Sequence, residues 1–174
     1  MSKTGNNSTE NAVKKASTKK ETKIKTVEEG DMMADFELFD YDDNPHHLNE
    51  FVGKGKYTIL EFSGLGCAPC QAAKPYLEKF YKENHDKFEM ITISTDNEKL
   101  WKKKPCGEVS WNEWNDHKSG REIALKYGVS GIPVFFIIDP DGKIEKKCMA
   151  LQGFFDAMKK YIPAEKLESY KKIK

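Results

Sequence analysis

Two cysteines three positions apart, Cys67 and Cys70, are the residues of this chain best suited to do chemistry. They follow an apolar, strand-like run at 57–62 and precede a helical pattern that begins at Ala68. The start of a helix has unpaired backbone N–H groups and a positive dipole end, which stabilise the thiolate that attacks disulfides. We therefore predict Cys67 as the nucleophile. Cys70, one turn inside the helix, is predicted to resolve the mixed disulfide that Cys67 forms with a partner.

A Cys-x-x-Cys pair is also half of a structural zinc site, which needs two further Cys or His ligands at matching spacing. The remaining candidates are Cys106, Cys148, His46, His47, His85 and His117. None of them forms a second close pair with ligand-like spacing, so the pattern favours a redox dithiol and predicts no metal or other cofactor. Two interpretations of Cys106 and Cys148 stay open: a second disulfide in an oxidising compartment, or buried free thiols.

Glu61 lies in the middle of the apolar run, with parity opposite to that of Leu60 and Phe62. We expect this strand to be buried on both faces, where a carboxylate is costly unless it has a partner or a function. Burial would raise the pKa of Glu61 toward neutrality. The alternative is a glutamate on an edge strand that faces solvent.

The composition predicts one globular domain with an appendage. The chain has 174 residues, 38% of them hydrophobic, and a formal net charge of +1. Residues 1–29 carry almost no large apolar side chains, so we expect a disordered polar tether there and the folded domain at 30–174. The lysines of the tether have no aromatic residues interleaved for base stacking, so nucleic acid is not an expected partner.

No run of eighteen apolar residues is present, which predicts no transmembrane segment, and the N-terminus has no signal-peptide hydrophobic region. A polar stretch directly after Met1 is what remains when a signal or lipoprotein leader has been removed. It also fits a cytosolic protein. The sequence pattern alone leaves both locations open.

The order of the predicted elements indicates an α/β fold. We expect a hairpin at 34–48, strands at 57–62, 88–94, 133–138 and 143–148, and helices at 68–84, 119–128, 151–161 and 164–172, with a short further helix that opens at Thr95 and runs through Trp101. Capping-box patterns, Thr95-x-x-Glu98 and Ser119-x-x-Glu122, predict the starts of two helices, and residues 102–116 are expected to form a loop. This order predicts a mixed sheet with helices on both faces.

From about residue 33 to 162 the chain resembles thioredoxin-fold proteins, and more narrowly the extracytoplasmic TlpA/ResA-type thiol-disulfide oxidoreductases. The matching pieces are Ala34-Asp35-Phe36, the Cys67–Cys70 motif, Pro75, the run from Tyr127 to Pro133 and the hairpin 135–142. Their order and separations carry the resemblance. It implies a thioredoxin-like mixed sheet with an N-terminal β-hairpin extension.

The resemblance also implies roles for single residues. Pro133 would be the cis-proline that faces the active site, with the backbone of Ile132 pairing with an extended substrate segment. Glu61 would carry the proton of the buried second thiol. The implied activity is reduction of protein disulfides in the periplasm or cell envelope, for example on apocytochrome c cysteines, with electrons from a membrane-embedded thiol carrier. A monomer is expected, held to the membrane by a lipid anchor if a leader has been removed.

The chain departs from the family pattern at Gly66, where a tryptophan usually precedes the first cysteine. Trp111 and Trp114 could replace that aromatic surface, or they could pack their loop against the core. Two other functions stay open. A peroxiredoxin usually has Thr three residues before its cysteine and an Arg nearby, but position 64 is Gly and Arg121 is the only arginine. A binding module or copper carrier would use both thiols without turnover. The leading prediction is a protein-disulfide oxidoreductase.

Overall fold

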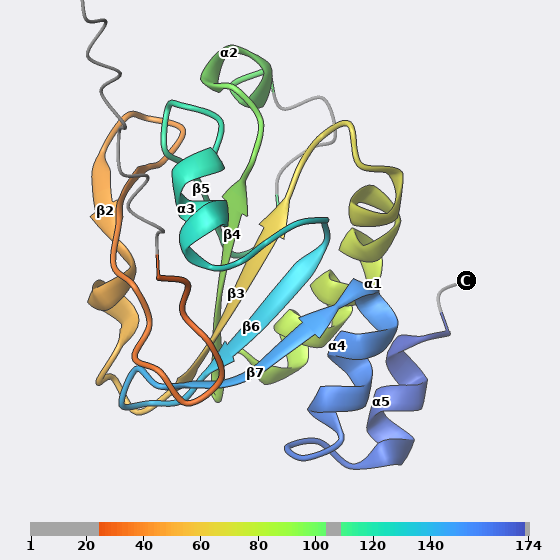
Figure 1. The fold of residues 1–174 in the computed structure, drawn as a ribbon. Coiled ribbons are helices and arrows are strands. Elements are labelled where there is room, and N and C mark those ends of the chain that lie inside the picture. The colour runs from red at the N-terminus through yellow and green to blue at the C-terminus, as the bar shows by residue number, and fades with distance from the viewer. Residues whose placement is uncertain (1–24, 104–108, 173–174) are drawn as a thin grey trace, which may run out of the picture.

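The computed structural model describes residues 25–103 and 109–172, and its centre is a seven-stranded sheet (Figure 1). The strands are β1 (Glu37–Phe39), β2 (Pro45–His47), β3 (Tyr57–Ser63), β4 (Phe88–Ser94), β5 (Asn112–Asn115), β6 (Val134–Ile138) and β7 (Ile144–Met149). The helices are α1 (Ala68–Asn84), α2 (Glu98–Trp101), α3 (Arg121–Lys126), α4 (Ala150–Met158) and α5 (Ala164–Tyr170), with a 3-10 turn η1 (Leu48–Phe51).

The sheet is mixed, with strand order β2-β1-β5-β4-β3-β6-β7. β3, β4 and β5 run parallel, whereas β6 pairs antiparallel with β3, and β7 with β6. The predicted leading hairpin is present as β1 and β2, which join the sheet beside β5 through the pair Phe39 and Asn115. The mixed sheet and its hairpin extension are therefore confirmed.

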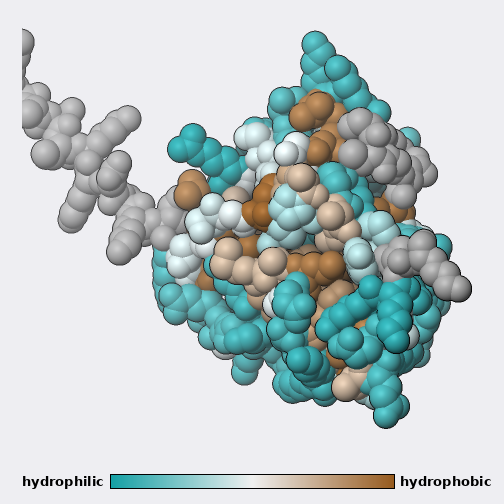
Figure 2. Space-filling view, turned by 90° about the vertical axis from the view of Figure 1, so that its right-hand side faces the viewer, coloured by the Kyte–Doolittle hydropathy of each residue, from teal (hydrophilic) through white to brown (hydrophobic). Residues whose placement is uncertain are grey.

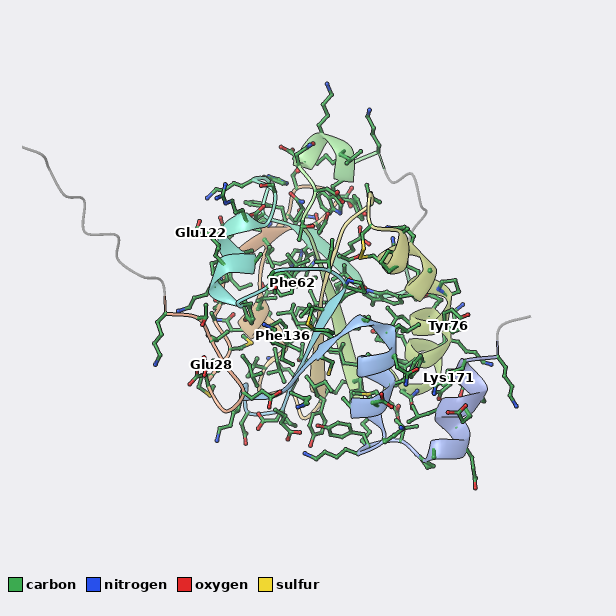
Figure 3. The ribbon with its side chains drawn as sticks, turned by 45° about the vertical axis from the view of Figure 1, so that its right-hand side comes forward. Glu28, Phe62, Tyr76, Glu122, Phe136 and Lys171 are labelled. Carbon is green, nitrogen blue, oxygen red and sulfur yellow. A yellow bond between two sulfur atoms is a disulfide. The ribbon has the colours of Figure 1, made fainter. Side chains whose placement is uncertain are left out.

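Side chains alternate between two hydrophobic cores, one on each face of the sheet. The first core lies under α1, α4 and α5 and contains Phe80, Phe135 and Phe154. The second lies under α3 and contains Phe62 and Phe136, whose ring centroids are 5.9 Å apart in the interior of the molecule (Figure 3). Figure 2 views the side of α1, α4 and α5, where hydrophobic residues surface in the middle and hydrophilic residues surround them. The covering of both faces by helices is confirmed.

The prediction of a loop over 102–116 is wrong at its end, because β5 forms there and pairs parallel with β4. Its four residues, Asn-Glu-Trp-Asn, show no hydrophobic alternation, so the sequence pattern did not indicate a strand. Two tryptophans hold the strand in place, because Trp111 packs in the first core and Trp114 in the second. Both indoles are buried, which confirms the packing role and removes them as a docking surface.

Two helix starts differ from the predicted capping boxes. α2 is capped by Asn97, whose Oδ1 accepts the N–H of Leu100 at 2.9 Å, and not by Thr95. α3 begins after Gly120 without a side-chain cap from Ser119. Instead, Oδ1 of the buried Asp116 accepts the N–H groups of three successive residues, Lys118, Ser119 and Gly120, at 2.8, 2.9 and 2.8 Å. One carboxylate therefore fixes the turn that leads into α3, and the helix itself has no side-chain cap.

The predicted end of α3 is confirmed at Gly128, which has φ +58°. Its N–H donates to Leu125 O, and the N–H of Val129 donates to Ala124 O, the paired bonds of a Schellman motif. This turn leads directly into the segment that carries Ile132 and Pro133.

Most of the polar tether predicted at residues 1–29 lies outside the described residues. The described part contacts the domain: the N–H of Val27 donates to Lys126 O, and Glu29 accepts the N–H of Lys147. Disorder of the preceding residues stays a prediction.

Candidate active site

Cys67 and Cys70 form a disulfide with a Cα–Cα distance of 5.2 Å at the start of α1. Cys67 is the N-cap residue and has extended backbone angles, and its Sγ accepts the N–H of Cys70 at 3.2 Å. Pro69 is in the first turn of the helix, where its missing N–H costs no hydrogen bond. Cys67 is partly exposed, whereas Cys70 is completely buried. An external sulfur can therefore reach Cys67 only.

The loop before Cys67 is fixed by the turn after β4. Oδ2 of Asp96 accepts the N–H of Leu65 at 2.8 Å and the hydroxyl of Ser94 at 3.1 Å. At Gly64 a Cβ would lie 3.2 Å from Cδ1 of Ile132, so this glycine permits a close approach between the loop before Cys67 and the segment that carries Ile132. At Gly66, in contrast, a Cβ would meet no atom within 4 Å. The position directly before Cys67 is therefore open space.

The Ile132–Pro133 bond is cis, as predicted. The carbonyl oxygen of Ile132 lies 3.6 Å from Sγ of Cys67, so this backbone borders the exposed sulfur. Pro133 is buried, and its carbonyl accepts the N–H of Ala150 at 3.0 Å. The segment after α3 is thereby held against α4 and brought beside the disulfide.

Glu61 is buried in the centre of the sheet, with β4 and β6 as neighbours of β3, which excludes the edge-strand alternative. Its Oε2 accepts the hydroxyl of Thr92 at 2.5 Å, and its Oε1 has no hydrogen-bond partner. Burial raises the pKa of Glu61 to about 7, and the hydrogen bond from Thr92 opposes this shift. A carboxyl group in this state can exchange a proton near neutral pH.

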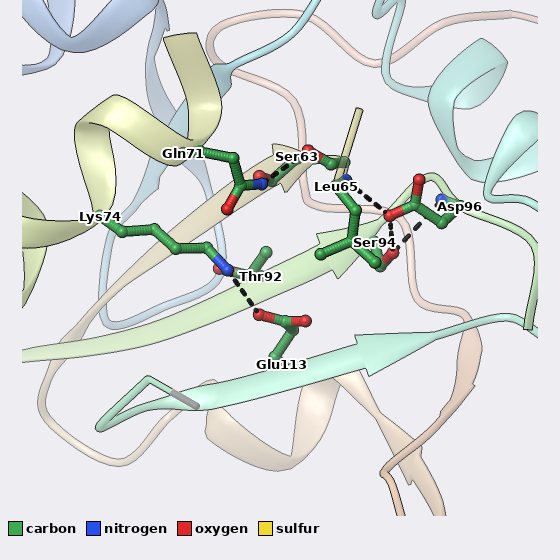
Figure 4. A pocket seen from close by; sticks show the side chains of 9 residues that line it. Ser63, Leu65, Gln71, Lys74, Thr92, Ser94, Asp96 and Glu113 are labelled. Carbon is green, nitrogen blue, oxygen red and sulfur yellow. Dashed lines mark hydrogen bonds and ion pairs between the residues drawn. The ribbon is translucent and has the colours of Figure 1, made fainter. Parts of the chain in front are cut away.

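A second acidic group, Glu113 of β5, lies on the same side of the sheet and lines a small polar pocket with Lys74 of α1 (Figure 4). Nζ of Lys74 lies 3.8 Å from Oε2 of Glu113. Sequence reasoning missed Glu113 because residues 102–116 were expected to form a loop, and it missed Lys74 because the helix pattern at 68–84 gives no sign of a partner on another element. The available signal was Glu113 flanked by two tryptophans, which becomes interpretable only when β5 is recognised as a strand.

The other cysteines lie apart from the dithiol or outside the described residues. Cys148 of β7 is a buried free thiol, and burial raises its pKa to about 11. A thiol of this kind is unreactive at neutral pH. Because Cys148 is free, it forms no disulfide with Cys106, which itself falls within 104–108, outside the described residues.

One cluster among the described residues brings possible metal ligands together: Asp43, Glu98 and His117. The ammonium group of Lys102 forms ion pairs with both carboxylates. The cluster is therefore explained as an ion-pair network around Lys102. It contributes no group to the dithiol site.

The profile of the AhpC/TSA family matches residues 30–147. Among curated proteins, the thiol-disulfide oxidoreductase ResA of Bacillus thuringiensis is 31% identical over 124 residues, which is 71% of this chain and 70% of that protein. No described helix is long and apolar enough to cross a membrane.

Solved structures similar to this chain are also thioredoxin-type proteins. The thioredoxin domain of a thiol-disulfide oxidoreductase from Bacteroides vulgatus is 28% identical with a TM-score of 0.68, over 79% of this chain and 99% of that one. The exposed lipoprotein thioredoxin of Streptococcus pneumoniae is 25% identical with a TM-score of 0.62, over 73% and 99% of the two chains. With its thioredoxin-like fold and Cys67–Cys70 disulfide, the chain belongs to the AhpC/TSA family and is a ResA-like thiol-disulfide oxidoreductase.

Proposed function

We propose that this oxidoreductase reduces disulfides of protein substrates, with Cys67 as the nucleophile and Cys70 as the resolving thiol. The single observation that carries this assignment is the difference in exposure: Cys67 is partly exposed at the helix start, and Cys70 is buried behind it. The N–H of Cys70 and the positive end of α1 both favour negative charge on Sγ of Cys67.

The reaction transfers two electrons to the substrate. The Cys67 thiolate attacks one sulfur of the substrate disulfide, which forms a mixed disulfide and releases one substrate thiolate. The Cys70 thiolate then attacks Sγ of Cys67, which releases the second substrate thiolate and leaves the Cys67–Cys70 disulfide. An external dithiol of a separate electron donor then reduces that disulfide and is itself oxidised.

Glu61 is proposed to accept the proton of Cys70 during the second step. Cys70 has no contact with solvent, so its thiol needs an internal acceptor to become a thiolate. Glu61 lies on the face of the sheet that α1 covers, and burial brings its pKa to about 7. That value suits an acceptor that must take up and release a proton at neutral pH.

The backbone of Ile132, next to Pro133, is proposed to pair with an extended substrate segment. The position of the Ile132 carbonyl beside Sγ of Cys67 supports this role, because a peptide held there would bring its own sulfur to the nucleophile. Recognition through the backbone would give little dependence on substrate sequence.

The cell envelope is the proposed location, with apocytochrome c cysteines as one substrate and a membrane-embedded thiol carrier as the electron donor. The ResA-type relatives and the pneumococcal lipoprotein support a location outside the cytoplasm. A lipid anchor and a monomeric state are part of the same proposal.

Reduction of insulin or of a mixed glutathione disulfide by the dithiothreitol-reduced protein tests the assignment. We expect Cys67→Ser to abolish turnover and Cys148→Ala, the matched control at a buried free thiol, to retain it. Turnover that survives in Cys67→Ser would contradict the proposal. Retention of one Cu(I) per chain after dialysis against a weak chelator, without turnover, would instead favour the carrier function.

A further inference from the structure

Three polar residues form a row across the parallel part of the sheet. Glu61 of β3 pairs with Thr92 of β4, and Thr92 pairs with Glu113 of β5. Paired residues of parallel strands point to the same face. Trp111 directly precedes β5 and lies two positions before Glu113, so the two side chains point to the same face. Trp111 packs in the core under α1, and the whole row therefore faces that helix.

Lys74 lies next to one end of this row, at Glu113. It lies on α1, one turn after Cys70, and its Nζ is 3.8 Å from Oε2 of Glu113, with side-chain exposures of 16% and 8% (Figure 4). The other oxygen of Glu113 accepts Nε1–H of Trp101 at 3.0 Å and the hydroxyl of Tyr41 at 2.5 Å. The carboxylate is therefore fixed in place, and its charge is compensated by one ammonium group.

The pair has two opposite effects on Glu61. The negative charge of Glu113 raises the pKa of Glu61, and the positive charge of Lys74 lowers it. Both side chains are largely shielded from solvent, so their fields are screened less than those of surface charges. Together they leave a nearly neutral environment, and removal of either one leaves a net charge close to Glu61.

The titratable groups on this side of the sheet and at the pocket can be named element by element. Among the described residues, α1 contributes Cys70 and Lys74, β5 contributes Glu113, the turn after β4 contributes Asp96 at the same pocket, and β7 contributes the thiol Cys148 to the same core. The direct sheet neighbours Thr92 and Phe135 do not ionise near neutral pH. Among these groups, Glu113 raises the pKa of Glu61 and Lys74 lowers it.

We propose that Lys74 and Glu113 are a positioning pair for thiol-disulfide exchange, which balances the charge beside Glu61 so that Glu61 can take up and release the proton of Cys70 at neutral pH. This inference rests on the proposed role of Glu61. Among the described residues, the polar contacts of the pair go to Trp101, Tyr41 and each other, so the pair acts through the field at that carboxyl group.

The direct test is a pH titration of the Glu61 carboxyl carbon by 13C NMR in the oxidised protein, with its signal assigned by its loss in Glu61→Gln. We expect Glu113→Gln to lower the midpoint and Lys74→Met to raise it, each by about one pH unit, and the double variant to return near the parent value. Glutamine keeps an acceptor oxygen for Trp101 and Tyr41. Lys82→Met, an exposed lysine of α1, is the matched control and should leave the midpoint unchanged.

The second readout is the pH profile of the resolving step, measured as release of substrate from the Cys67 mixed disulfide. We expect this profile to shift in the same directions as the NMR midpoint. Two single variants that leave the midpoint unchanged, or move it in the same direction, would overturn the role of the pair alone. Opposite NMR shifts with an unchanged rate profile would overturn the role of Glu61 in the reaction and, with it, that of the pair.

Discussion

The hydroxyl of Thr92 donates a 2.5 Å hydrogen bond to Oε2 of Glu61 across the β3–β4 pair. Trp111 fixes its direction, because Nε1–H of the indole donates to the same Thr92 oxygen at 2.8 Å and leaves the hydroxyl hydrogen for Glu61. The other carboxyl oxygen of Glu61 has no partner. A buried carboxyl group with one hydrogen bond is only weakly stabilised as an anion, which explains why burial dominates its pKa.

The first prediction concerns stability against pH. The pKa of Glu61 is about 7 in the folded protein and 4.5 in the unfolded reference, so between these values the folded state binds the additional proton. The contribution of this proton to the free energy of unfolding is therefore fully present below pH 4.5 and is lost as the pH rises through 7. In Glu61→Gln this loss is absent, so its advantage over the parent should grow by about 3 kcal/mol between pH 4 and pH 8.

Urea denaturation at both pH values measures this difference. Glu122→Gln, at an exposed glutamate of α3, is the control, and its stability should follow that of the parent at each pH. Parallel curves for Glu61→Gln and the parent would show that Glu61 does not titrate between these limits.

Much of the fold could be predicted because its signals are local. The apolar run at β3, the alternation at β4, the turn before β7 and Gly128 after α3 each carry a pattern within a few residues. β5 could not be predicted in this way. Its polar residues show no strand period, and what holds it is the burial of Trp111 and Trp114 on opposite faces, a tertiary effect.

The residues of the candidate site also fall into those with a local sequence signal and those without one. Cys67, Cys70 and Glu61 were recognisable because each contrasts with its immediate surroundings in the sequence. Lys74 and Glu113 were not, because an ion pair between α1 and β5 depends on strand order and register. Asp116 was missed because its carboxylate binds backbone N–H groups of the turn before α3, for which the sequence carries no capping-box pattern.

The second prediction is that Cys70→Ser accumulates a mixed disulfide on Cys67. Without the second thiol, the first exchange has no internal resolving step, and the substrate stays attached. Mass spectrometry of the protein incubated with a disulfide-containing peptide should show one peptide per chain, located on Cys67. The control is Cys67→Ser with Cys70 intact, which should form no adduct because Cys70 is buried. Adducts only on Cys106 or Cys148 would show that the nucleophile is misassigned.

The third prediction concerns Asp116, whose Oδ1 accepts three backbone N–H groups in a buried position. Asp116→Ala leaves those donors without a protein partner, so we expect a loss of about 2–3 kcal/mol in the free energy of unfolding. Asp116→Asn keeps an acceptor oxygen and should lose clearly less. Chemical denaturation measures both. A loss below about 0.5 kcal/mol in the alanine variant would show that solvent replaces the carboxylate.

The fourth prediction concerns the open position before the nucleophile. A Cβ at Gly66 meets no neighbouring atom, and the residue does not have a positive φ, so Gly66→Trp should fold normally. The indole would add apolar surface beside the exposed Cys67, which a protein substrate can contact and a small disulfide contacts much less.

We expect KM for reduction of insulin to fall by about 2- to 10-fold in Gly66→Trp, the equivalent of one aromatic contact, with little change in the rate toward glutathione disulfide. Gly66→Ala controls for the loss of glycine itself and should behave as the parent does. If Gly66→Trp changed both substrates equally, the substitution would be acting on Cys67 and not on docking. If neither changed, an aromatic residue directly before the first cysteine would have no docking function here, and Ile132 with Pro133 would account for substrate contact without it.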